Sequence, residues 1–200
     1  MPLRYLALGD SYTIGEDVPA GQRWPMQLVD KLRRTGMVID DPQIVAVTGW
    51  TTDELSNGMD QAEFVPGYDL VTLLIGVNNQ YRGRHAEAYR GEFRDLLLRA
   101  ITLAGKRPGR VVVVSIPDWG VTPFGHKSGR DRQQIAHELD TFNAIARDEA
   151  LHAGASFVNI TGISRDHADL VASDGLHPSG AQYVLWTESM IPVVRKALLG

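Results

Sequence analysis

The chain contains no cysteine among its 200 residues. Without a thiol it can form no disulfide bond, offer no thiolate nucleophile and build no cysteine-based zinc site. It also lacks an excess of basic residues, because 20 Lys and Arg stand against 24 Asp and Glu and the net charge is −4. Such a surface neutralises phosphates poorly, so we predict no nucleic-acid partner.

Long apolar runs and targeting segments are missing as well. No apolar stretch reaches the ~20 residues that a membrane span needs. The first apolar segment begins at Leu3, and no charged region, apolar core and cleavage site of a signal peptide come before it. We therefore predict a protein without a membrane span, located in the cytoplasm. Repeats, linkers and low-complexity segments are also absent, so we expect one domain over residues 1–200.

The chain does contain a regular alternation of apolar strands and amphipathic helices. We expect strands over residues 3–9, 43–47, 70–75, 110–116 and 156–160, and helices over residues 24–34, 51–62, 86–104, 133–152 and 181–199. Unbroken apolar strands, such as the valine run that begins at Val111, indicate a sheet covered on both faces. The pattern predicts an α/β fold, a doubly wound, flavodoxin-like parallel sheet of about five strands with helices on both faces.

In a sheet of this kind, ligands bind beyond the carboxyl ends of the strands. The loops that follow the five predicted strands contain, in order, Gly9-Asp10-Ser11-Tyr12, Thr48-Gly49-Trp50, Gly76-Val77-Asn78-Asn79, Pro117-Asp118-Trp119-Gly120 and Ser173-Asp174-Gly175-Leu176-His177. These loops supply a hydroxyl, glycine and amide donors, and an Asp three residues before a His. Together these are the parts of an acyl-transfer site.

The chemistry of acyl transfer requires each of these groups. A serine hydroxyl such as that of Ser11 is a poor nucleophile until a base removes its proton. Histidine accepts a proton well near neutral pH, and a carboxylate, here Asp174 beside His177, can hold the imidazole in the correct tautomer. Backbone N–H groups and an amide side chain then stabilise the negative charge on the carbonyl oxygen.

Each residue also has a purely structural interpretation. Ser11 could cap a helix, and Gly49 could simply permit a turn. Asn78 and Asn79 could be turn residues that bond their own backbone, and Asp174 could cap the last helix. None of these interpretations accounts for the placement of all the groups at the strand ends of one sheet.

Four segments of the chain resemble, in the right order, the sequence blocks of the SGNH (GDSL) hydrolases. The segments are Tyr5–Tyr12, Gly49, the run Gly76-Val77-Asn78-Asn79, and the run Asp174-Gly175-Leu176-His177-Pro178. The resemblance implies a serine esterase or lipase in which Ser11 is the nucleophile, His177 the general base and Asp174 its partner. It also implies an oxyanion hole made by the backbone N–H groups of Ser11 and Gly49 and the side chain of Asn78.

The resemblance has one departure, because Asn79 stands where the family usually has Asp. A supporting hydrogen bond or charge beside the third strand should therefore differ in this chain. The sequence has no Gly-x-Ser-x-Gly motif, so it does not resemble the nucleophile-elbow hydrolases.

Further residues near these loops are candidates for a substrate pocket. They are Asp10, Tyr12, Asn79, Tyr81, Trp119 and Phe124. No histidine shows a metal-ligand spacing with acidic residues, and no cofactor motif is present, so we expect neither a metal nor a cofactor.

Three hypotheses for the function remain at this stage. The first is hydrolysis of small carboxylic esters through an acyl-serine intermediate, which an apolar pocket would favour. The second is O-deacetylation of a sugar or glycan with the same groups, which an open groove with aromatic and charged residues would favour. The third is a non-catalytic, flavodoxin-like module that binds a nucleotide or another ligand. The chain has neither Gly-x-Gly-x-x-Gly after its first strand nor Gly-x-x-x-x-Gly-Lys-[Ser/Thr], and the third hypothesis leaves Asp174 and His177 unexplained.

Overall fold

A computed structural model describes residues 1–200 and contains one five-stranded sheet. Its strands are β1 (Tyr5–Gly9), β2 (Gln43–Ala46), β3 (Leu70–Leu74), β4 (Val111–Val114) and β5 (Ser156–Val158). They lie in the order β2-β1-β3-β4-β5, and every neighbouring pair is parallel. This order is the doubly wound arrangement that the sequence predicts, and its direction switches between β1 and β3.

Apolar side chains on both faces explain why these segments form strands. Every residue of β1, β3 and β4 is buried. Leu8 of β1 lies in register between Val45 of β2 and Leu73 of β3, so core side chains cross the sheet in rows. Because β1 is flanked by strands on both sides, its carboxyl end is held firmly inside the sheet.

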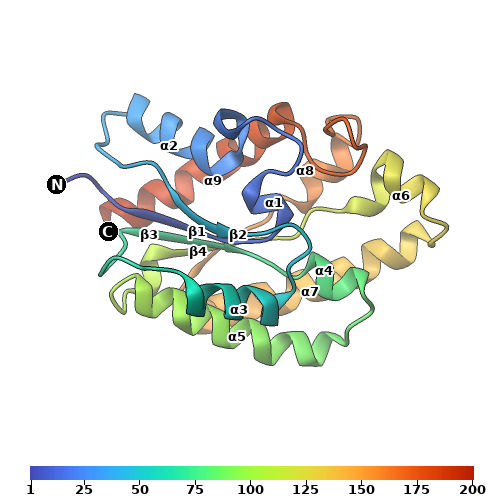
Figure 1. The fold of residues 1–200 in the computed structure, drawn as a ribbon, viewed down its shortest axis with the longest axis horizontal. Helices are drawn as coiled ribbons and strands as arrows, with labels where there is room; N and C mark the ends of the chain where they lie inside the picture. The colour runs from blue at the N-terminus through green and yellow to red at the C-terminus, as the bar shows by residue number, and fades with distance from the viewer.

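Two layers of helices cover the sheet (Figure 1). On one face, α2 (Trp24–Arg34) packs against α9 (Gly180–Leu199). The other face is covered by α3 (Thr52–Gln61), α5 (Ala86–Leu103) and α7 (Arg132–His152). No helix is both long and apolar enough to cross a bilayer.

The long elements match the sequence prediction, and their ends differ from it by no more than two residues. Side-chain caps fix several of these ends. Thr51 and Glu54 form a capping box at the start of α3, and the Asp131 carboxylate accepts the N–H groups of Gln133 and Gln134 in the first turn of α7. Such caps satisfy N–H groups that have no partner within the helix.

The sequence analysis did not predict four short helices. They are α1 (Ser11–Ile14), α4 (Val77–Tyr81), α6 (Pro123–Lys127) and α8 (Thr161–Asp166), and 3₁₀ turns lie at Ala20–Gln22, Pro108–Arg110 and Trp119–Val121. One or two turns are too short to show a helical period of apolar residues. Helices α1, α4 and α6 follow β1, β3 and β4, and they lie together at the carboxyl edge of the sheet (Figure 1).

Candidate active site

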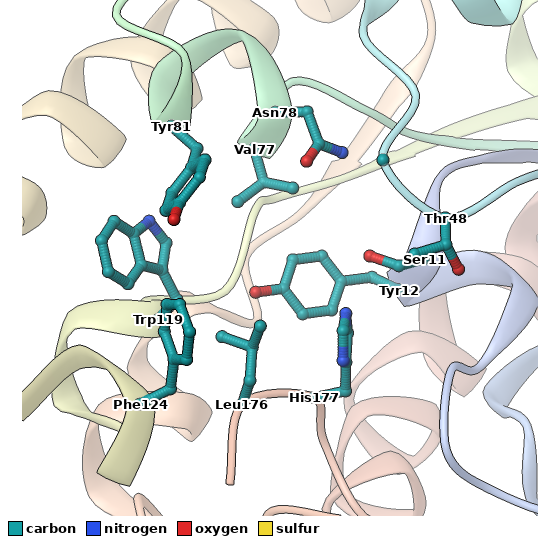
Figure 2. Close-up of a pocket in the computed structure, with 11 residues that line it drawn as sticks. Ser11, Tyr12, Thr48, Val77, Asn78, Tyr81, Trp119, Phe124, Leu176 and His177 are labelled. Atoms are coloured by element: carbon teal, nitrogen blue, oxygen red, sulfur yellow. The ribbon is translucent and has the colours of Figure 1, made fainter. Parts of the chain in front are cut away.

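A cavity of about 220 Å³ lies at this carboxyl edge. Residues from the loops after all five strands line it, namely Ser11, Tyr12, Thr48, Gly49, Val77, Asn78, Tyr81, Trp119, Phe124, Leu176 and His177. Figure 2 shows that Ser11, Thr48 and His177 lie at one end of the cavity, and that the aromatic rings of Tyr81, Trp119 and Phe124 lie at the other. The predicted nucleophile, base and oxyanion donors therefore meet in one space.

Ser11 is the first residue of α1, directly after the end of β1. The turn that places it there is tight, because a side chain at Gly9 would collide with Thr13 and with the carbonyl of Leu74. Asp10 caps α1, and its Oδ1 accepts the N–H of Tyr12 at 3.0 Å. The orientation of Ser11 is therefore set by the strand end and by the cap.

Asp10 does not line the cavity, which corrects its prediction as a pocket residue. Its side chain is fully buried beneath α1, and its Oδ2 has no hydrogen-bond partner. Burial raises the pKa of the Asp10 carboxyl to about 7, although the N–H of Tyr12 and its own backbone N–H partly oppose that rise. Asp10 is thus a structural cap with an unusually basic carboxyl.

His177 and Asp174 form the pair that their spacing predicts. Nδ1 of His177 lies 2.5 Å from Oδ2 of Asp174, and Oδ1 of Asp174 accepts the N–H groups of Leu176 and His177. Burial raises the pKa of Asp174, but these hydrogen bonds outweigh it, so the pKa of Asp174 lies below its ordinary value. An ionised carboxylate can only accept, so Nδ1 carries a proton, and in the tautomer that acts as a base Nε2 is left as the acceptor.

Ser11 and His177 approach each other without a direct hydrogen bond in this structure. One ring nitrogen of His177 is directed toward Ser11 and Tyr12 (Figure 2). Catalytic hydrogen bonds are often long in free enzymes and shorten once substrate is bound. In this arrangement Nε2 faces the side of the cavity from which it could take a proton from Ser11.

Asp17 ties the loop after Ser11 to the loop that carries Asp174. Its Oδ2 accepts the backbone N–H of Asp174 at 3.0 Å and the hydroxyl of Ser173 at 2.5 Å. Asp17 adopts a φ of 59°, in the left-handed region that non-glycine residues seldom occupy. Strained residues of this kind are retained where surrounding contacts hold them, often beside functional sites.

Gly49 and Asn78 place hydrogen-bond donors beside Ser11. Gly49 has a φ of 87°, which favours glycine, and its N–H makes no hydrogen bond within the protein. Nδ2 of Asn78 donates to the carbonyl of Trp50 at 2.9 Å, so one amide hydrogen orients the side chain and the second remains free.

Arg82 strengthens the same connection between α4 and the loop after β2. Its Nη2 donates to the carbonyl of Gly49 at 2.7 Å, and its Nη1 lies 3.3 Å from the carboxylate of Glu54. The loop that presents the Gly49 N–H is therefore fastened to α4 at two points, through Asn78 and through Arg82.

Asn79 faces away from the cavity, which corrects its prediction as a pocket residue. It is fully buried, its Oδ1 accepts the N–H of Thr52, and its Nδ2 donates to the Thr52 hydroxyl at 2.6 Å. Nδ2 also lies 3.3 Å from the carboxylate of Glu92. Asn79 therefore joins α4 to α3 and α5.

The remaining predicted pocket residues do line the cavity, and they make its wall largely apolar. Tyr12, Tyr81, Trp119 and Phe124 contribute rings, and Tyr81 contacts Trp119 edge to face with ring centroids 5.4 Å apart. The indole Nε1 of Trp119 donates to Gln80 Oε1 at 2.9 Å, which holds the ring in place.

Sequence reasoning missed several residues of this region. Thr48, Val77 and Leu176 line the cavity and sit within the same loops as the predicted residues, so adjacency alone could have found them. No sequence motif marks Asp17 or Arg82, because their hydrogen-bond partners, Asp174 and Gly49, lie far away in the sequence. No group of His, Asp and Glu side chains is arranged to hold a metal ion.

The sequence profile of the GDSL-like lipase/acylhydrolase family matches residues 7–185. This chain belongs to that family. The GDSL family consists of carboxylic ester hydrolases, so the chain is an ester-hydrolysing enzyme that acts on an ester substrate. No curated protein sequence matches this GDSL family member significantly.

Solved structures share the fold of this GDSL hydrolase at low sequence identity. The psychrotrophic esterase EstA from Pseudoalteromonas sp., in a structure inhibited by monoethylphosphonate, is 18% identical with a TM-score of 0.71, covering 98% of this chain and 99% of EstA. A lipase/acylhydrolase from Enterococcus faecalis is 15% identical with a TM-score of 0.72, covering 96% and 95%. The acetylxylan esterase Axe2 from Geobacillus stearothermophilus is 16% identical with a TM-score of 0.72, covering 96% and 94%.

Proposed function

We propose that this enzyme hydrolyses small carboxylic esters through an acyl-serine intermediate. The observation that carries the proposal is the shared cavity, in which Ser11, His177, Gly49 and Asn78 line one space. A pocket that joins a hydroxyl, an oriented imidazole and convergent N–H donors is the arrangement that acyl transfer needs.

In the proposed reaction, Oγ of Ser11 attacks the ester carbonyl carbon while Nε2 of His177 takes the hydroxyl proton. Asp174 orients the ring and stabilises the imidazolium. The carbonyl oxygen becomes negatively charged in the tetrahedral intermediate, and the N–H groups of Ser11 and Gly49 and the amide of Asn78 stabilise it. The intermediate then releases the alcohol, which receives the proton from His177. Water attacks the acyl-serine by the same steps and releases the acid.

The shape and lining of the cavity favour an acyl group that is mostly apolar. Its far wall consists of Val77, Trp119, Phe124 and Leu176, and its volume of about 220 Å³ fits a small group rather than a polymer. O-deacetylation of a sugar or glycan is the alternative, and one structural neighbour, Axe2, is an acetylxylan esterase. A mostly apolar cavity is a poorer match for a polyhydroxylated alcohol, so we favour the simple esters.

The test combines labelling with two variants. A serine-directed organophosphonate should modify Ser11 and abolish turnover, and Ser11→Ala should lose most of the rate while still folding. His177→Ala should be about as damaging, because the two residues act as a unit. His152→Ala is the matched control, since His152 is exposed at the end of α7. Full activity in Ser11→Ala, or labelling at another serine, would refute the mechanism. Comparing p-nitrophenyl esters with acetylated xylo-oligosaccharides separates the two substrate classes.

A further inference from the structure

Tyr12 is a rigidly held side chain beside the proposed nucleophile. Its carbonyl accepts hydrogen bonds from Trp24 Nε1 at 3.0 Å and from the Tyr183 hydroxyl at 3.2 Å. Its ring stands edge-on to the ring of His177, with centroids 5.6 Å apart, and it also packs against Trp186. Only 3% of the residue is exposed.

The hydroxyl of Tyr12 nevertheless makes no hydrogen bond within the protein, although its ring is enclosed. The other four buried tyrosine hydroxyls all have partners, which are Thr72 for Tyr5, Gln43 for Tyr68, Ile75 for Tyr89 and Tyr12 for Tyr183. Figure 2 shows the Tyr12 hydroxyl pointing into the middle of the cavity. The surrounding side chains there are those of Val77, Trp119 and Leu176.

A hydroxyl that loses its water on substrate binding and gains no other partner is costly, and nearly all polar groups removed from water in proteins are hydrogen-bonded. Val77 and Leu176 offer neither a donor nor an acceptor, and the indole N–H of Trp119 is already bonded to Gln80. In the free protein, water in the cavity can bond this hydroxyl, and a substrate that displaces the water must supply a polar atom in its place. Since the hydroxyl lies away from His177, that atom is separate from the ester oxygens that react.

We propose that the Tyr12 hydroxyl selects esters whose acyl chain carries a hydrogen-bonding oxygen, such as a ketone or hydroxyl, several bonds from the ester carbonyl. This proposal rests on the proposed function, and it narrows the substrate class for the same site. In this proposal the enclosed part of the cavity holds the acyl group, which stays attached to Ser11 after the alcohol has left. A site built to bond a polar group rejects the analogue that lacks it, because its own polar atom is then left without a partner.

The experiment compares pairs of p-nitrophenyl esters that differ only in one oxygen. The pairs are hexanoate against 4-oxohexanoate and hexanoate against 5-oxohexanoate, with each rate corrected for spontaneous hydrolysis. The wild-type protein should prefer at least one oxo ester by about fivefold or more in kcat/KM, the range expected of one hydrogen bond. Tyr12→Phe should lose that preference, measured as the ratio of kcat/KM for the oxo ester to kcat/KM for hexanoate within the same protein.

Two controls separate selection from a structural effect. Tyr12→Phe should leave the urea midpoint of unfolding unchanged or raise it, because its hydroxyl has no protein partner. Tyr5→Phe removes a buried hydroxyl that bonds Thr72, so it should lower the midpoint but leave the preference for the oxo ester intact. An equal loss of activity on hexanoate and on the oxo esters in Tyr12→Phe would overturn the proposal.

A second comparison tests whether the acyl group or the alcohol of the ester contacts Tyr12. It compares butyl acetate with the acetate of 4-hydroxy-2-butanone, which carries a ketone in the alcohol instead. The proposal would be overturned if the wild type preferred the ketone-bearing acetate and Tyr12→Phe did not. It would also be overturned if wild type and Tyr12→Phe preferred the oxohexanoates over hexanoate to the same extent. Neither result would contradict the proposed hydrolysis, which is tested separately by Ser11→Ala and by organophosphonate labelling.

Discussion

Replacing Asn79 with the family's usual aspartate should destabilise this chain, because a carboxylate already faces that position. Nδ2 of Asn79 lies 3.3 Å from Oε2 of Glu92 and 2.6 Å from the Thr52 hydroxyl. Asn79→Asp keeps an acceptor for the N–H of Thr52, and the Thr52 hydroxyl could turn to donate to the new carboxylate, but the contact with Glu92 becomes one between two acceptors. Glu92 thus gives a physical reason for the amide at this position.

The size of the effect follows from the separation of the two charges. Two unit charges 3.3 Å apart repel by about 5 kcal/mol at an effective dielectric constant of about 20. The Glu92 side chain is 36% exposed, so solvent screening should reduce the cost to about 2–3 kcal/mol.

Repulsion raises the pKa of the introduced carboxyl in the folded state only. The folded protein therefore binds the extra proton more tightly, and the destabilisation should grow by about 1 kcal/mol as the pH rises from about 5 to about 8.

Urea unfolding at both pH values measures this effect directly. Wild type, Asn79→Asp and the double variant Asn79→Asp/Glu92→Gln should be compared. The double variant again has one carboxylate and one amide at this contact, so it should recover most of the lost stability at the higher pH. Repulsion is refuted if the double variant is as unstable as the single one, or if the cost of Asn79→Asp does not change with pH.

The other predictions concern the proposed oxyanion donor, a positioning residue and the buried cap. Asn78→Ala should reduce kcat by roughly 10²–10³ with KM little changed, since its free N–H acts mainly in the transition state; steady-state kinetics with a p-nitrophenyl ester checks this. Asp17→Ala should lower kcat by about fivefold because the backbone N–H of Asp174 loses its partner, whereas Asp17→Asn should retain more activity; equal loss in both variants would contradict the positioning role. Asp10→Asn should flatten the pH dependence of stability, since the raised pKa of Asp10 makes the wild type lose stability as the pH rises from about 4 to about 7. Urea midpoints across that range measure the slope, and an unchanged slope would show that Asp10 does not cause it.

The long elements of the fold could be predicted because their apolar pattern extends over many residues. Two examples are the run of valines that begins at Val111 and the helical spacing of apolar residues within 86–104. α1 and α4 could not be predicted in this way, because a helix of four or five residues has no measurable period. Their caps lie in loops whose geometry depends on the strands before them.

The candidate site was predictable in its parts but not in the direction of every side chain. Sequence blocks located Ser11, Asn78 and His177, and the cavity brings them together. Asp10 and Asn79 are their direct neighbours, yet both point into the interior, since adjacent residues on a turn or short helix face different ways. Adjacency in the sequence therefore identified the correct loops and misassigned two of their side chains.

The placement of Ser11 and His177 near opposite ends of the chain has a consequence for folding. Ser11 follows the first strand, and His177 precedes the last helix, which packs against the first long helix of the chain. A nascent polypeptide that has emerged as far as residue 170 would hold the proposed nucleophile but not its base. Hydrolysis therefore becomes possible only after contacts between the two ends have formed. In a refolding experiment, the return of turnover would report when these contacts form, whereas far-ultraviolet circular dichroism would report the gain of helices.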